Sequence, residues 1–161
     1  MTREELENTY EAALNDAAKQ LSYRELSASA LREKLLKKGH SEDAVDYALA
    51  WLTERKLLDD SRFAESTVHS YGRRGYGTLR IRQELHRRGV SREDTAAAME
   101  DYAPDDAMLL ALLDKKLQGD LSDPRAVQRA IAYLQRRGFP WSDIRRALNE
   151  YGAALDEQFD G

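Results

Sequence analysis

Three glycines divide this sequence at nearly equal intervals, and each of them follows two cations. They are Gly39, Gly89 and Gly138, which stand 50 and 49 residues apart. Aligning the chain on them also aligns apolar residues on both sides, such as the leucine four positions before each glycine and the alanine nine positions after it. Within each half the aligned positions are separated by steps of one, three or four residues. These are helical spacings, since strand alternation needs steps of two.

Each glycine is therefore predicted to separate two amphipathic helices, because glycine just past a helix end accepts the left-handed conformation that other residues resist. A third predicted helix precedes each pair. The predicted repeats span residues 1–56, 57–103 and 104–155, with an acidic C-terminal tail at 156–161. The fold class is thus all-α, with three tandem three-helix repeats. One unit of about fifty residues buries little surface, so we expect the repeats to stack into an elongated, curved helical array.

Polar residues mark several predicted helix starts. Ser41 and Ser91 follow two of the repeat glycines closely and are predicted N-caps. In the third repeat Pro140 occupies this position, so Ser142 is expected to cap instead. The pair Asp59-Asp60 is interpreted as an N-cap with favourable charge at a helix start, rather than as an acid/base pair.

The composition excludes several kinds of protein. There is no cysteine, and therefore no disulfide scaffold, thiol nucleophile or cysteine-ligated zinc. The histidines, His40, His69 and His86, have neither metal-like spacing nor an obvious hydrolytic partner. We therefore expect no enzyme activity, no metal and no cofactor. No apolar run is long enough to span a membrane, and the acidic first residues lack the apolar region of a secretory signal, so a cytoplasmic protein is expected.

The segment from Gly72 to Thr78 contains three glycines and two arginines, and at first sight it looks like a phosphate loop. A Walker loop places lysine and then serine or threonine directly after its last glycine. The lysine is missing here, so nucleotide hydrolysis is not expected. Two interpretations stay open: a flexible loop between helices, or a place where the two arginines and exposed backbone N–H groups hold an isolated phosphate.

The net charge of -4 is an average over two strongly positive segments and an acidic remainder. Residues 73–88 and 125–146 each contain six arginines and one acid. Helix macrodipoles account for the two cations before each glycine, but not for the surplus. Because the guanidinium fork suits phosphate and carboxylate, the surplus favours a polyanion or acidic protein partner over a merely solvated face. The candidate partner- or DNA-binding residues are Arg73, Arg74, Arg80, Arg82, Arg87, Arg88, Arg136, Arg137, Arg145 and Arg146.

The tight spacing of the helices raises an alternative function, a helix-turn-helix DNA-binding transcription regulator. Such a protein needs cationic or amide side chains at the start of its recognition helix. The last helices of the first two repeats begin instead with Ser41-Glu42-Asp43 and Ser91-Arg92-Glu93-Asp94, whose carboxylates suit DNA badly. Only the third repeat, with Arg145 and Arg146, offers suitable side chains.

Three stretches of the sequence resemble the signatures of one known family, RecX, a family of bacterial recombination regulators. They are Leu57-Leu58-Asp59-Asp60-Ser61-Arg62-Phe63-Ala64, then Gly75-x-Gly77-x-x-Arg80-Ile81-x-x-Glu84-Leu85-x-x-x-Gly89, and Leu134-x-Arg136-Arg137-Gly138-Phe139. The resemblance covers about residues 12–151, nearly the whole chain. One departure is Lys56, where family members often have glycine before the two leucines.

The resemblance implies three tandem three-helix repeats, and it implies a function that the periodicity does not give. RecX proteins bind the RecA recombinase and its filament on single-stranded DNA, and they inhibit or modulate its recombinase, ATPase and coprotease activities. A regulatory role in DNA recombination, DNA repair and the SOS response is therefore expected, with the recombinase as partner. Direct DNA binding is reported for some members. A monomer is favoured, and no catalytic residue is carried over.

Overall fold

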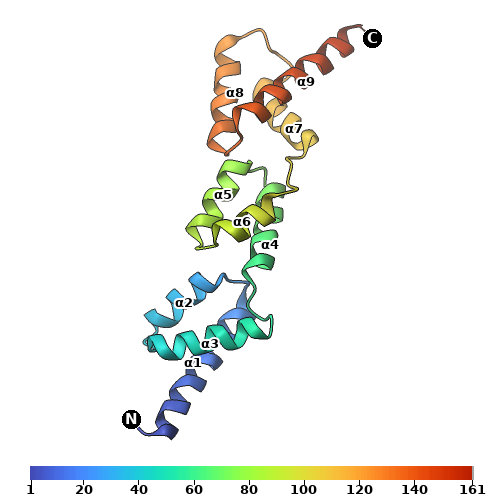
Figure 1. Ribbon diagram of the computed structural model, residues 1–161. Helices are drawn as coiled ribbons and strands as arrows, with labels where there is room; N and C mark the ends of the chain where they lie inside the picture. The colour runs from blue at the N-terminus through green and yellow to red at the C-terminus, as the bar shows by residue number, and fades with distance from the viewer. Residues whose placement is uncertain (161) are drawn as a thin grey trace. The chain divides into compact units, whose positions relative to one another are not determined.

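The computed structural model describes the backbone of residues 1–160 and the side chains of residues 1–157, and in this part of the chain the regular secondary structure is all helical, without strands (Figure 1). The helices are α1 Arg3–Tyr23, α2 Ala28–Lys37, α3 Glu42–Glu54, α4 Asp60–Arg73, α5 Thr78–Arg87, α6 Arg92–Met99, α7 Asp106–Leu117, α8 Pro124–Arg136 and α9 Trp141–Asp160. The expected all-α class with three three-helix repeats is confirmed. α9 includes residues 156–160 of the predicted tail, while Gly161 lies outside the described residues.

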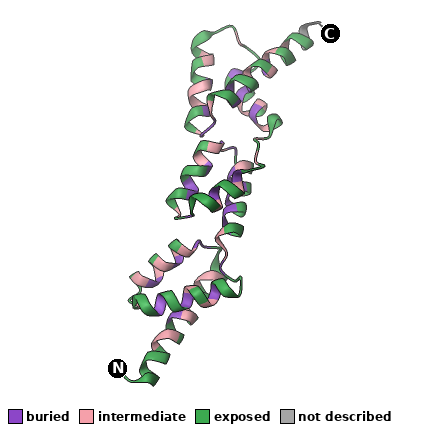
Figure 2. Cartoon of the chain, in the orientation of Figure 1, coloured by how far each residue is buried: buried purple, intermediate pink, exposed green. Residues whose placement is uncertain are grey.

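The chain divides into two compact units, and the second repeat contributes to both. The first unit comprises residues 1–66 and 85–98, and the second comprises residues 67–84 and 99–161. In the first unit α1, α2 and α3 pack around a core that includes Leu31, Leu35 and Leu52. In the second, α7, α8 and α9 pack around a core that includes Leu134 and Ile144. Figure 2 shows buried and exposed residues alternating along these helices, as amphipathic helices require.

The turns around the repeat glycines follow the sequence prediction closely. Gly39, Gly89 and Gly138 have φ angles of +94°, +78° and +91°, the left-handed conformation expected after a helix end. Ser41 and Ser91 accept hydrogen bonds from backbone N–H groups three residues on, at 3.2 and 3.0 Å, so both predicted N-caps are confirmed.

The predicted cap at Ser142 is wrong. α9 begins at Trp141, directly after Pro140, so Ser142 lies inside the first turn of the helix. The carbonyl oxygen of Pro140 accepts from the N–H groups of Asp143 and Ile144. Proline has a fixed φ close to the helical value, and this lets the helix start beside it without a side-chain cap.

The two aspartates of the Leu-Leu-Asp-Asp signature cap two different helices. Asp59 Oδ1 accepts from the N–H of Arg62 at 3.2 Å, which is the predicted N-cap of α4. Asp60 Oδ1 instead accepts from the N–H of Ala28 at 2.8 Å, at the start of α2. Burial raises the pKa of the Asp60 carboxyl, with the charge of Asp94 adding to the shift. The signature therefore fastens α4 to α2 as well as starting α4.

Lys56, the departure from the family pattern, has a left-handed backbone with φ of +56°. For residues other than glycine this conformation costs about 1–2 kcal/mol. We therefore expect Lys56→Gly to raise the free energy of unfolding by about 1 kcal/mol in urea titrations, since the exposed side chain forms no ion pair with the described residues. Lys56→Ala serves as the control. If both variants were equally stable, the gain would not come from relief of backbone strain.

Candidate functional site

The glycine-rich segment that resembled a phosphate loop is part of a joint between the second and third repeats. α4 continues through Arg73, so the loop itself comprises only residues 74–77. Its backbone N–H groups are already used. Those of Gly75 and Tyr76 donate to the end of α4, and that of Gly77 donates to the carbonyl oxygen of Arg137 at 2.8 Å. The interpretation of these N–H groups as exposed donors for an isolated phosphate is therefore wrong.

The joint brings two backbones into direct contact. A Cβ atom at Gly77 would lie closer than 3.0 Å to the backbone of Gly138, and one at Gly138 would lie closer than 3.0 Å to the backbone nitrogen of Arg80. The N–H of Leu79 donates to the carbonyl oxygen of Gly138 at 2.9 Å, which completes the contact. We call the contact between residues 74–80 and 137–139 the α5–α8 joint. All of it lies within the second unit.

Arg137 holds this joint together through its side chain. Its Nε donates to the carbonyl oxygen of Gly75 at 2.7 Å, and its Nη2 donates to that of Arg74 at 2.6 Å. Its guanidinium carbon also lies 4.5 Å from the centre of the Tyr76 ring. Arg74 and Arg80 lie 5.4 and 5.3 Å from the same ring. Three of the candidate binding residues therefore surround one tyrosine, an arrangement that stabilises the fold.

The first unit contains a related joint at the corresponding repeat positions. Ser27, which aligns with Gly77, donates from Oγ to the carbonyl oxygen of Arg88 at 2.6 Å. Arg88 aligns with Arg137, and its guanidinium lies 5.8 Å from the centre of the Phe63 ring. Arg87, one position earlier, is exposed at the end of α5. The start of the middle helix in one repeat thus contacts the glycine turn of the next repeat at both places.

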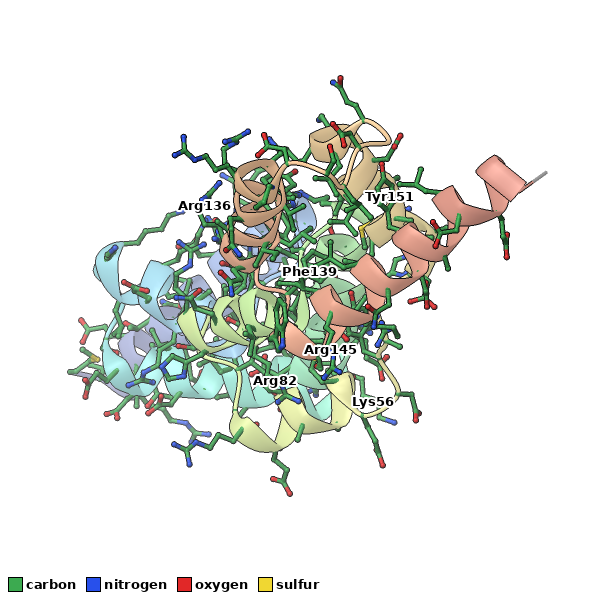
Figure 3. All side chains as sticks on the ribbon, turned by 90° about the horizontal axis from the view of Figure 1, so that it is seen from above. Lys56, Arg82, Arg136, Phe139, Arg145 and Tyr151 are labelled. Carbon is green, nitrogen blue, oxygen red and sulfur yellow. The ribbon has the colours of Figure 1, made fainter. Side chains whose placement is uncertain are left out.

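The candidate arginines that are left fall into two groups. Arg146 forms ion pairs with Asp143 and Asp106, both at 3.2 Å. Within residues 1–157, the side chains of the other four are exposed and form neither an ion pair nor a hydrogen bond: they are Arg73, Arg82, Arg136 and Arg145. In Figure 3, Arg136 lies on one side of Phe139, while Arg82 and Arg145 lie on the other. These three exposed arginines of the second unit therefore do not lie on one side of it.

Sequence reasoning did not single out a groove between α7 and α8, both in the second unit. The groove has a volume of about 390 Å³ and is lined by Lys116, Ala126, Arg129, Ala132, Tyr133 and Arg136. The sequence could have indicated part of this groove, because Arg129 and Arg136 are seven residues apart on one predicted helix and therefore lie on the same face. Lys116 belongs to another helix, so its place in the groove depends on the packing of α7 against α8.

The described residues offer neither a metal site nor a membrane span. No group of three or more His, Asp or Glu side chains among them could hold a metal ion. None of the helices described is both long and apolar enough to cross a membrane. His40 forms a contact of 2.8 Å with Asp16 through Nε2, and both side chains are partly buried within the first repeat.

The fold and the exposed arginines define a class: an all-α protein of tandem three-helix repeats with several exposed arginine side chains. The family models for the first, second and third three-helix domains of RecX match residues 13–52, 59–99 and 104–148. The chain belongs to the RecX family.

Curated relatives and solved structures agree with this assignment. The regulatory protein RecX of Chromohalobacter salexigens is 36% identical over 83% of this chain and 89% of its own length. That of Halorhodospira halophila is 38% identical over 91% of this chain and 90% of its own length. The crystal structure of RecX from Lactobacillus salivarius matches with a TM-score of 0.84 at 20% identity, covering 91% of this chain and 98% of the other. This structural match supports the fold.

Proposed function

We propose that this protein is a non-enzymatic cytoplasmic regulator of the RecA recombinase, which it binds as a filament on single-stranded DNA. In this proposal it restrains the recombinase, ATPase and coprotease activities of the filament, and so acts in DNA recombination, DNA repair and the SOS response. Membership of a family of regulatory proteins supports the regulatory role. The choice of contact surface rests on one observation: several exposed arginines form no ion pair within the described residues. Such arginines suit a partner that is part DNA and part protein.

Tandem repeats suit such a partner because several weak contacts along a regular filament add up to one strong interaction. The proposal includes a monomeric protein whose repeats form a curved array lying along the filament. The alternative, a helix-turn-helix transcription regulator, is less favoured. The starts of α3 and α6 carry acids, and Arg146 at the start of α9 is held by Asp143 and Asp106.

The proposal is tested by recombinase ATPase on single-stranded DNA, with this protein titrated in. We expect inhibition by the wild type. The variant Arg73→Ala/Arg82→Ala/Arg145→Ala should need about tenfold more protein for half-inhibition at moderate salt, because three charge-assisted interactions with the partner are removed. Arg74 and Arg80 are left unchanged because they contact Tyr76 in the fold. Arg136 is left unchanged because it lines the separate α7–α8 groove.

The matched control removes three exposed cations elsewhere, as Arg3→Ala/Lys19→Ala/Arg24→Ala. It should inhibit almost as well as the wild type. Absence of inhibition by the wild type with a cognate recombinase would overturn the proposed function. Equal inhibition by both triple variants would show that these arginines are not the contact surface.

A further inference from the structure

The α7–α8 groove is lined by three cations and no acid. Lys116 comes from α7, and Arg129 and Arg136 come from α8. All three side chains are exposed, and the lining between them consists of two alanines and Tyr133. The groove lies between two helices of the second unit, so its shape does not depend on the placement of the two units.

The positive charge of the groove is not neutralised within the described part of the chain. α8 contains no acidic residue, and neither Arg129 nor Arg136 forms an ion pair there. The Lys116 ammonium lies 4.3 Å from the centre of the Tyr133 ring, which holds it in place without cancelling its charge.

The acids of the neighbouring segments are engaged elsewhere. Asp114 Oδ1 accepts from the Tyr151 hydroxyl at 2.7 Å, and Asp120 Oδ1 accepts from Ser122. Asp123 Oδ1 accepts from the N–H of Arg125 at 3.0 Å and so caps α8. None of these carboxylates lines the groove, so its cations are accessible to an external anion.

We propose that the α7–α8 groove binds the phosphate backbone of single-stranded nucleic acid. Arg129 and Arg136 are two turns apart on α8, a rise of about 10 Å, so they can contact different phosphates of one strand. The small side chains of Ala126 and Ala132 let the strand approach the helix closely. Tyr133 lies beside the cations, with Lys116 and Arg137 over its ring at 4.3 and 5.6 Å, so its part is to position the groove cations rather than to stack on a base.

An acidic protein segment fits the groove less well. Protein interfaces have an apolar centre with large anchor side chains, and Tyr133 is the only large apolar group among the six lining residues. This inference deepens the proposed function by naming the surface that contacts DNA. Its test contains no recombinase. The proposed DNA binding by the groove can therefore be disproved while the proposed regulation of the recombinase stands, and the regulation can be disproved while DNA binding by the groove stands.

The test measures binding of a fluorescently labelled oligothymidylate to the purified full chain by anisotropy, at several salt concentrations. Lys116→Glu is compared with Lys115→Glu, which makes the same charge change one residue away, outside the groove lining. Arg129→Glu is compared with Arg3→Glu in the same way. We expect each groove variant to weaken binding about tenfold or more at about 0.15 M salt, and each control less than about threefold.

The salt dependence provides a second measurement. Removing one phosphate-binding side chain should reduce the slope of log affinity against log salt by about 0.7. Arg129→Lys, which keeps the charge, should retain most of the binding, and circular dichroism should show unchanged helix content in all variants. If a glutamate variant had reduced helix content, Lys116→Ala and Arg129→Ala would be measured in its place, with the alanine versions of the controls.

Four results would overturn the inference. The first is no binding by the wild type even at about 0.05 M salt. The second is an equal loss in the groove variants and their controls, which would show a general charge effect. The third is competition by polyglutamate as effective as by unlabelled oligothymidylate of the same charge, which would show an acidic-protein site. Competition by inorganic phosphate at equal phosphate concentration would likewise show a site for free phosphate rather than for a strand.

Discussion

Replacing Gly77 or Gly138 by alanine should lower the free energy of unfolding by about 2–5 kcal/mol, the largest effect expected from a single methyl group in this chain. At both positions the added Cβ would lie closer than 3.0 Å to backbone atoms of the α5–α8 joint. Backbone cannot rotate away as a flexible side chain can, so the two chain segments must separate. At Gly138 the φ of +91° adds strain to the clash.

Gly39→Ala is the control for this prediction. Gly39 has a φ of +94°, almost the same as that of Gly138, but a Cβ there would meet nothing within 4 Å. Its cost should therefore be the backbone strain alone, about 1–2 kcal/mol. Urea unfolding of the three variants measures the difference. If Gly39→Ala and Gly138→Ala were equally destabilised, the close packing of the joint would contribute nothing to stability.

The neighbouring residues Arg136 and Arg137 should behave in opposite ways when each is changed to alanine. Arg137→Ala removes two charge-assisted hydrogen bonds and a contact with the Tyr76 ring, so it should lower the free energy of unfolding by about 2–4 kcal/mol. Arg136→Ala removes an exposed side chain without an ion pair in the described residues, so stability should change by less than about 0.5 kcal/mol.

Binding should show the reverse order. Arg136→Ala should weaken oligothymidylate binding several-fold, because Arg136 lines the α7–α8 groove. Arg137→Lys provides a further check on stability. One ammonium group cannot reproduce the planar guanidinium fork that reaches both carbonyl oxygens. The lysine variant should therefore recover less than half of the unfolding free energy lost in Arg137→Ala. A stable Arg137→Ala protein with weakened binding would contradict this division of roles.

A related difference separates the two members of all three cation pairs before the repeat glycines. The first cation of each pair is exposed: Lys37, Arg87 and Arg136. The second is used within the fold. Lys38 pairs with Asp16 at 3.1 Å, Arg88 lies over Phe63, and Arg137 binds carbonyl oxygens beside Tyr76. The sequence shows three equivalent pairs, whereas the structure shows that the second member of each contacts a more distant part of the fold, although Lys38 is itself exposed.

Much of the fold followed from the sequence because the signals for it are local. Helical periodicity, the left-handed glycines and the caps at Ser41 and Ser91 each depend on residues a few positions apart. The predicted N-cap at Ser142 was wrong because of an equally local effect: Pro140 changed the residue at which α9 begins.

The surroundings of the candidate arginines could not be predicted in this way, because they depend on contacts between distant segments. The carbonyl oxygens that Arg137 binds lie 62 and 63 residues away in the chain. The oxygen that caps Ala28 comes from Asp60, 32 residues on. Spacing along one helix cannot reveal such partners. Ten arginines therefore looked alike in sequence, although several of them stabilise the fold.

The sequence by itself determined the repeat, the helical class, the turns and the family, since each is encoded in residue types at short or regular spacing. The tertiary structure decided which arginines are available to a partner. A guanidinium group has the same charge wherever it lies, but its role depends on whether a carbonyl oxygen, an aromatic ring or a carboxylate is within reach. That neighbour can come from a distant segment of the chain, as the carbonyl oxygens bound by Arg137 do, and only the tertiary packing determines it.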